Sequence, residues 1–128
     1  QQWAVNALGQ MQVTQKFIDL LKMGITPKII NVTSESGSIS TMEHFRGYYY
    51  FGSKATMNMF TRCLAWDPET AGMITIALHP GWVRTDMGGS KADLSVTESA
   101  DGILKVIAAL TAEDNGKFYT WEGKEYPW

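Results

Sequence analysis

Residues 29–34, IINVTS, form a short run rich in β-branched side chains, and they place apolar groups on both faces of an extended strand. Residues 73–78, MITIAL, have the same character. Strands that are apolar on both faces are typical of a parallel sheet that helices cover on both sides. These two runs therefore predict the buried centre of an α/β fold.

Helical patterns alternate with the strands. Apolar residues recur at helical spacing in three stretches, from about 4 to 23, from about 50 to 66 and from about 95 to 110. The second helix is predicted to end at Asp67-Pro68, and Ser95 with Glu98 forms a capping box that opens the third. A last strand is predicted over residues 117–121. The alternating order of helices and strands in 128 residues predicts a single α/β domain, residues 1–128, with about three strands.

Two of the helices carry an apolar stripe that is expected to face the sheet. The stripe residues are Ala4, Leu8, Met11, Ile18 and Leu21 in the first helix and Ala100, Ile103, Ile107 and Leu110 in the third. Residues 34–48 form a loop rich in Ser and Gly. Residues 79–94 contain three glycines and a proline and predict a long, mobile loop.

Charge and composition exclude several classes of function. The net charge is −2 and the eleven Lys and Arg residues are scattered among acids, so no nucleic-acid partner is expected. No apolar stretch is long enough to cross a membrane, so no membrane association is expected. The single cysteine, Cys63, excludes an internal disulfide and predicts a reducing, cytoplasmic location. Two histidines and one cysteine give no metal-ligand spacing, so no metal is predicted.

One set of side chains suits proton transfer to a carbonyl oxygen. Tyr50 and Lys54 are four residues apart at the start of a predicted helix and so share one face, and Ser34 ends the preceding strand. A free tyrosine has a pKa of about 10, so a neighbouring ammonium group is needed to favour its phenolate near neutral pH. A serine hydroxyl can donate a hydrogen bond to an oxygen that gains negative charge during a reaction.

Four motifs together resemble the carboxyl-terminal half of a short-chain dehydrogenase/reductase. They are Val5-Asn6 in the first helix, NVTS at 31–34, the Tyr-x-x-x-Lys motif from Tyr50 to Lys54, and LHPGWVRT at 78–85. Three further features are similar to the carbonyl-reductase group that includes the sniffer and C-factor proteins: the long, sixteen-residue step from Ser34 to Tyr50, DMGG at 86–89, and GKEYPW at 123–128. The resemblance covers essentially all 128 residues.

The resemblance implies a fold and an activity. The implied fold is a partial Rossmann-like, doubly wound parallel sheet that lacks its amino-terminal phosphate-binding half. The implied activity is that of an NAD(P)-dependent oxidoreductase, which transfers hydride between a nicotinamide cofactor and a small-molecule ketone or aldehyde. The resemblance favours NADP(H) over NAD(H), and the substrate itself is left open.

The resemblance also implies roles for individual residues. Tyr50 would be the acid in reduction, and Ser34 would hydrogen-bond the substrate oxygen. Lys54 would hold the nicotinamide ribose beside Tyr50, and Asn6 would fix a water that links the lysine to solvent. The residues implied at the nicotinamide end of the cofactor are Pro80, Gly81, Val83 and Thr85. Two apolar side chains could line a substrate pocket or simply pack, namely Trp82 and Met87.

A glycine-rich turn after the first strand normally holds the cofactor phosphates in such sheets, and none of the twelve glycines forms one here. The phosphate-binding half is therefore expected to be absent from this chain, which begins at Gln1. The alternative function is a non-catalytic, truncated remnant that acts through self-association, as a homo-oligomer, or through a protein partner, because the strand at 29–32 would expose an unpaired edge. A hydrolase built on Ser34, His79 and Asp86 is a weaker alternative, since no Gly-x-Ser-x-Gly elbow surrounds the serine.

Overall fold

The structure, a computed structural model, describes all residues from 1 to 128. Its three strands are β1 (Lys28–Val32), β2 (Ile74–His79) and β3 (Phe118–Thr120). Its three α-helices are α1 (Gln10–Leu21), α2 (Tyr48–Trp66) and α3 (Val96–Ala109). Four short helices complete it: a π-helix, η1 (Ala4–Gly9), and three 3₁₀ turns, η2 (Glu35–Gly37), η3 (Pro68–Thr70) and η4 (Ala112–Asp114).

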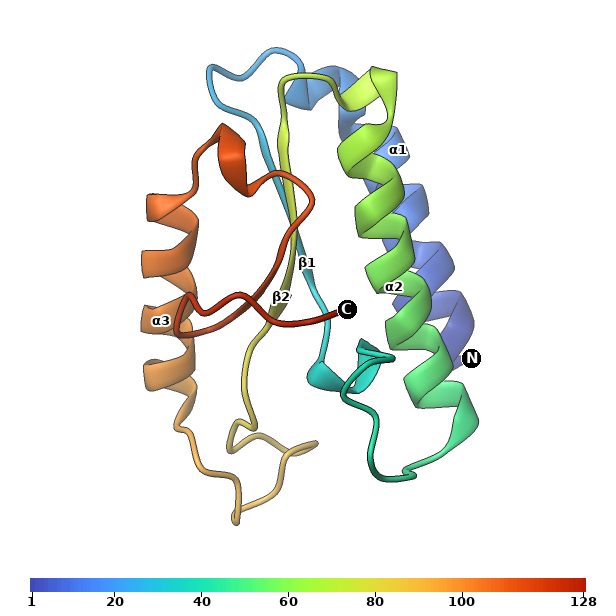
Figure 1. Ribbon diagram of the computed structural model, residues 1–128, viewed down its shortest axis with the longest axis vertical. Coiled ribbons are helices and arrows are strands. Elements are labelled where there is room, and N and C mark those ends of the chain that lie inside the picture. Colours follow the sequence, from blue (N-terminus) through green and yellow to red (C-terminus); the bar gives the residue numbers. More distant parts are fainter.

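The strands form one parallel sheet in the order β1-β2-β3. The register pairs Lys28 with Ile74 and Val32 with Leu78, and it pairs Ala77 with Phe118. Figure 1 shows α1 and α2 on one side of the sheet and α3 on the other. The predicted partial, doubly wound α/β fold is therefore confirmed.

The two faces of the sheet carry separate cores. Ile74, Ile76 and Leu78 of β2 pack together with Val106 of α3 on one face. On the other face, Leu64 of α2 packs with Ile29 of β1 and with Met73, which directly precedes β2. Because successive side chains of a strand point to opposite faces, one strand serves both helical layers.

The first helical segment differs from the prediction. It begins with the π-helix η1, whose wider turn takes up extra residues and breaks the 3.6-residue repeat. Ala7 is its buried residue, whereas the predicted Leu8 is 53% exposed. α1 has no fully buried side chain, although Met11 and Leu21 pack partly against the core.

The predicted sheet-facing stripe of α3 is confirmed at Ile103 and Leu110 and wrong at Ala100. Ser99 and Val106 are buried, and Ile103 and Leu110 pack beside them. Ala100 is exposed. The predicted capping box is confirmed, because the Ser95 hydroxyl accepts from the Glu98 N–H group and the Glu98 carboxylate accepts from the Ser95 N–H group. No helix of the structure combines the length and the apolar character that a membrane crossing requires.

Candidate active site

Tyr50 and Lys54 lie one turn apart in the first half of α2. The Lys54 Nζ atom is 5.9 Å from the centroid of the Tyr50 ring. Neither the Tyr50 hydroxyl nor the Lys54 ammonium group makes a hydrogen bond to another protein group, so both are free to bind a ligand. Burial lowers the pKa of Lys54, because the charged form is partly removed from water.

Ser34 follows β1 and caps the short helix η2. Its side-chain oxygen accepts a hydrogen bond from the Ser36 N–H group over 3.1 Å. A hydroxyl group has one proton to donate and two lone pairs, so this cap leaves the Ser34 proton available. Ser34 can therefore donate to a substrate oxygen while the cap fixes its position.

Two contacts hold the Ser34 segment against the Tyr50–Lys54 turn. The Thr33 hydroxyl donates to the Lys54 carbonyl oxygen over 3.5 Å. A Cβ atom built on Gly37 would lie only 2.8 Å from the carbonyl carbon and oxygen of Lys54. Only glycine permits this approach of η2 to α2. Gly37 is therefore a positioning residue of the candidate site that the sequence alone gave no reason to select.

Asn6 reaches the same turn through a serine that the sequence did not single out. The Asn6 Nδ2 group donates to the Ser53 hydroxyl oxygen over 3.2 Å, and the Ser53 hydroxyl donates to the Tyr50 carbonyl oxygen over 2.8 Å. Asn6 lies within the π-helix η1, and π turns often occur at functional sites. Asn6 is therefore linked to α2 beside Tyr50 and Lys54.

The segment Pro80–Thr85, called the strap below, follows β2 and contains the other predicted cofactor residues. Its loop is more ordered than predicted, because Val83 bridges Leu94 at the base. The Trp82 indole donates to the Gly88 carbonyl oxygen over 2.9 Å, and the Gly88 N–H group donates to the Thr85 hydroxyl over 3.1 Å.

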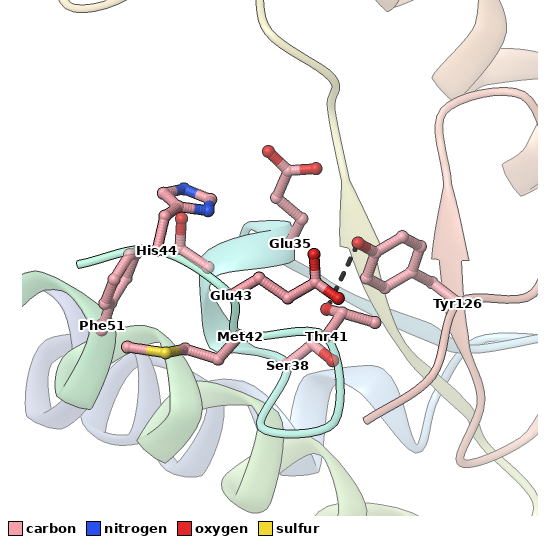
Figure 2. Close-up of a pocket in the computed structure, with 9 residues that line it drawn as sticks. Glu35, Ser38, Thr41, Met42, Glu43, His44, Phe51 and Tyr126 are labelled. Carbon is pink, nitrogen blue, oxygen red and sulfur yellow. Dashed lines mark hydrogen bonds between the residues drawn. The ribbon is translucent and has the colours of Figure 1, made fainter. Parts of the chain in front are cut away.

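A cavity of about 220 Å³ has walls from η2, the following loop, α2 and the chain end. Its lining includes none of the predicted catalytic residues, which are Asn6, Ser34, Tyr50 and Lys54. Figure 2 shows the Glu35 and Glu43 carboxylates between His44 and Tyr126, whose hydroxyl donates to Thr41 over 3.4 Å. Two lining residues, Glu35 and Phe51, follow Ser34 and Tyr50 in the chain, but successive side chains of a helix do not share a face. The lining consists of Glu35, Ser36, Ser38, Thr41, Met42, Glu43, His44, Phe51 and Tyr126.

The two predicted pocket residues of the strap loop are not part of this cavity lining. Trp82 is 48% exposed and is held by its bond to Gly88, and Met87 is 87% exposed at the tip of the loop. A substrate role for Trp82 and Met87 stays a prediction.

His79 lies at the end of β2 and pairs with Glu35, its Nε2 atom 3.6 Å from a carboxylate oxygen. Burial lowers the pKa of His79, and the Glu35 carboxylate opposes that shift. His79 makes no hydrogen bond with Ser34 or Asp86, so the contacts of a hydrolase triad are not formed. No three His, Cys, Asp or Glu side chains gather closely enough to hold a metal ion.

The residues present fit one end of a nicotinamide cofactor. A partly desolvated ammonium and a phenol, both without protein partners, suit the hydroxyl groups of a ribose. The phosphate end has no counterpart, because none of the three strands is followed by a glycine-rich turn that opens a helix. The residues present therefore suit the nicotinamide ribose, and no glycine-rich phosphate turn follows any of the three strands.

Comparison with known proteins agrees with this arrangement. Residues 1–95 match the family model described as short chain dehydrogenase. The chain is 40% identical to the C-signal protein of Myxococcus xanthus, covering 98% of this chain and 76% of that protein. It superposes on the carbonyl reductase Sniffer of D. melanogaster with a TM-score of 0.92 and 33% identity, and on an NADPH-bound carbonyl reductase from chicken fatty liver with a TM-score of 0.87 and 36% identity.

Each of these two structures covers 98% of this chain, whereas the chain spans only 55% of either reductase. The match to the family model covers the π-helix with Asn6, Ser34 at the start of η2, the Tyr50–Lys54 turn and the strap. This chain therefore belongs to the short-chain dehydrogenase family.

Proposed function

We propose that this chain carries the catalytic half of an NADP(H)-dependent carbonyl reductase, which reduces a ketone or aldehyde. The names of the superposable structures support the reaction type and the cofactor, because two are carbonyl reductases and one of them binds NADPH. The observation that carries the proposal is the Tyr50–Lys54 pair with the Ser34 segment held against it by Gly37. Cytoplasmic location belongs to the same proposal.

The proposed chemistry follows from the groups on α2 and η2. The reduced nicotinamide, when bound, supplies the hydride. The Tyr50 phenol gives its proton to the carbonyl oxygen of the substrate, and the Ser34 hydroxyl donates a hydrogen bond to that oxygen. A comparable donor in other enzymes contributes roughly 3 to 4 kcal/mol to the transition state.

Lys54 supports the proton transfer in two ways. Its ammonium group lies close enough to the Tyr50 ring to stabilise the phenolate that remains after the proton has left. Its partial burial strengthens that interaction, because charges interact more strongly away from water. Lys54 and Tyr50 also bind the ribose, while Asn6 holds the turn through Ser53.

The test compares the protein with a Tyr50→Phe variant. The variant keeps the ring and loses the proton, so NADPH oxidation with a small ketone should fall by at least about 100-fold. NADPH affinity measured by calorimetry should fall by no more than about tenfold, because only the hydrogen bond of the phenol to the ribose is lost. The matched control is Tyr49→Phe, the same change at the exposed neighbouring residue, which should leave both quantities unchanged.

Two outcomes would contradict the proposal. The first is an absence of NADPH binding by the unmodified protein. The second is substantial turnover by Tyr50→Phe, because general-acid catalysis would then come from another group.

A second candidate is a non-catalytic protein that acts through self-association or a protein partner. The observation that favours it is the open edge of β1, beside which a groove of about 420 Å³ runs between that strand and the first helical segment. Five apolar side chains of that segment are at least half exposed, namely Val5, Leu8, Val13, Phe17 and Leu20. Light scattering separates the candidates, since a monomeric, NADPH-binding protein would contradict this one.

A further inference from the structure

The strap begins at a buried anchor on α3. The Ser99 hydroxyl donates to the Pro80 carbonyl oxygen over 2.6 Å, and Ser99 is only 4% exposed. Gly81 follows with a φ of +82°, and a Cβ atom there would contact the side chains of Leu94 and Trp121. The first two strap residues are therefore tied to α3 and packed closely against Leu94 and Trp121.

Arg84 attaches the other end of the strap. Its Nη1 group donates to the carbonyl oxygens of Ala92 and Asp93, each over 2.9 Å. Its backbone N–H group donates to the Leu94 carbonyl oxygen over 2.8 Å. Arg84 thus joins the two segments that form the base of the loop, one at residue 84 and the other at residues 92–94.

Arg84 also connects the strap to the start of α3. Its Nη2 atom lies 3.8 Å from a carboxylate oxygen of Glu98, and that same carboxylate accepts the Ser95 N–H group over 2.8 Å. A guanidinium group has several donors in a fixed plane, so it can serve two carbonyls and a carboxylate together. Glu98 and Ser99 are neighbours, so both anchors of the strap converge on the first turn of α3.

We infer that Arg84 is a positioning residue for the cofactor-binding strap, with Ser99 as the second anchor. The inference rests on the proposed function, in which Pro80, Gly81, Val83 and Thr85 contact the nicotinamide end of the cofactor. Arg84 lies between the last two of these residues and points its side chain at the opposite side of the loop. Its role is to fix their backbone before the cofactor binds, without touching the cofactor itself.

The contacts of Arg84 with Ala92, Asp93 and Glu98 are called the clamp below. A trypsin site in the loop can report whether the clamp is closed. Lys91 is exposed, but the next residue, Ala92, is 3% exposed and its carbonyl oxygen is one of the two that Arg84 holds. Trypsin needs an extended, accessible segment to cleave after Lys91, so the clamp must open first.

The first experiment measures the rate of tryptic cleavage at the Lys91–Ala92 bond by mass spectrometry, without any cofactor. Arg84→Ala should raise that rate about tenfold under native conditions, because local opening becomes easier. Lys105→Ala is the matched control, since this exposed cation of α3 has no partner and its loss should change nothing. An unchanged rate in Arg84→Ala would overturn the clamp, whatever the protein catalyses.

The second experiment measures NADPH binding and steady-state reduction. Arg84→Ala should raise the Kd and KM for NADPH about tenfold and change kcat less than threefold, because the strap is misplaced while the Tyr50 chemistry is intact. Arg84→Lys should recover part of the affinity, since an ammonium group can serve only part of the fork. Ser99→Ala should weaken NADPH binding in the same direction, with Thr97→Ala in the same helical turn as its control.

The outcomes distinguish the inference from the proposed function. Faster cleavage with unchanged NADPH affinity would show that the strap is clamped but does not hold the cofactor, and would overturn the positioning role. A protein that binds no NADPH would overturn the proposed function and this role together, while the cleavage rates would still decide the clamp. If Arg84→Ala fails to fold, Glu98→Gln removes the ion pair while the Gln oxygen can still accept the capping bond from the Ser95 N–H group, and it should give a smaller effect of the same sign.

Discussion

The two sides of the sheet differ in how completely they are packed. β2 is paired on both edges, and five of its six residues are buried. β1 is paired on one edge only, and α1 beside it has no fully buried side chain. The Thr33 N–H group and the Pro27 carbonyl oxygen both bond to β2, so by alternation Ile30 and Val32 turn their backbone groups to the open edge.

The residues that stabilise the fold and the residues proposed for catalysis lie in different parts of the molecule. The proposed catalytic groups come from η1, the end of β1 and the first half of α2. α2 is well packed, with five buried residues, whereas η1 and α1 beside it have one between them. The strap comes from the well-packed side, where α3 anchors it. Changes in the core between β2, β3 and the chain end should therefore affect mainly folding, whereas changes at η2 and in the strap should also affect activity.

The largest expected effect compares the same substitution on the two sides. Phe118 is completely buried and packs against Tyr126 and Trp128, whereas Phe17 on α1 is 52% exposed. Phe118→Ala should lower the free energy of unfolding by about 3 to 5 kcal/mol, because it leaves a cavity in the core. Phe17→Ala should change it by less than about 0.5 kcal/mol. Urea unfolding measures both, and equal losses would remove the distinction between the sides.

The second prediction tests the contact between η2 and α2. Gly37→Ala places a methyl group against the Lys54 backbone, so η2 must move and the free energy of unfolding should fall by about 1 to 3 kcal/mol. Carbonyl reduction should fall at least about 100-fold, because Ser34 moves with η2. Gly72→Ala is a control for stability alone, since no atom lies within 4 Å of its added Cβ and only the backbone strain at φ +85° remains. Retained turnover in Gly37→Ala would contradict this account of the site.

Local signals explain which parts of the fold could be predicted. Alternation and capping act within a few residues, so the three strands and the Ser95–Glu98 box were found from sequence. The stripe on the first helical segment was wrong at Leu8 because the π turn of η1 changes the spacing without any glycine or proline to mark it. On α3, Ala100 was predicted to face the sheet, but its neighbour Ser99 is the buried residue. Ser99 is polar, and its hydroxyl bonds to the Pro80 carbonyl oxygen.

Contacts between distant residues explain what was missed at the site. Tyr126 reaches the cavity from the end of the chain and bonds Thr41, 85 positions earlier in sequence. Ser53 and Gly37 matter only because of what lies next to them in space. Motifs located Asn6 and the Tyr50–Lys54 pair, but no motif describes the neighbours that position them.

The third prediction concerns pH and the packed side. A hydrogen bond of 2.5 Å from the Tyr119 hydroxyl, with a further one from the Thr111 N–H group, lowers the pKa of Asp114 to about 2. The folded value lies below the unfolded value of 3.8, so this carboxylate stabilises the fold above the unfolded pKa and loses that effect as pH falls through about 2. Allowing for solvent screening, the contribution near neutral pH is on the order of 1 kcal/mol.

Asp114→Asn should therefore lower the free energy of unfolding by about that amount at neutral pH, and the difference from the unmodified protein should vanish towards pH 2. Urea unfolding at a series of pH values measures this difference. A gap that stays constant across the acid range would mean that Asp114 acts through shape and not through its charge.

The smallest expected effect on folding tests the exposed side directly. Val13, Phe17 and Leu20 are spaced as one face of α1, and all three are more than half exposed. In the second candidate function, this apolar row is the face through which copies of the chain would associate. Phe17→Glu should change the free energy of unfolding by less than about 0.5 kcal/mol, yet it should raise the dissociation constant for self-association at least about tenfold, equivalent to 1.4 kcal/mol.

Light scattering over a range of protein concentrations measures that dissociation constant. Gln15→Glu is the matched control, because it adds the same charge to an exposed position of α1 without removing apolar surface. If both variants associate like the unmodified protein, the exposed face of α1 is not what brings copies together. If Phe17→Glu unfolds the chain instead, α1 must contribute more to the core than the exposure of its side chains indicates.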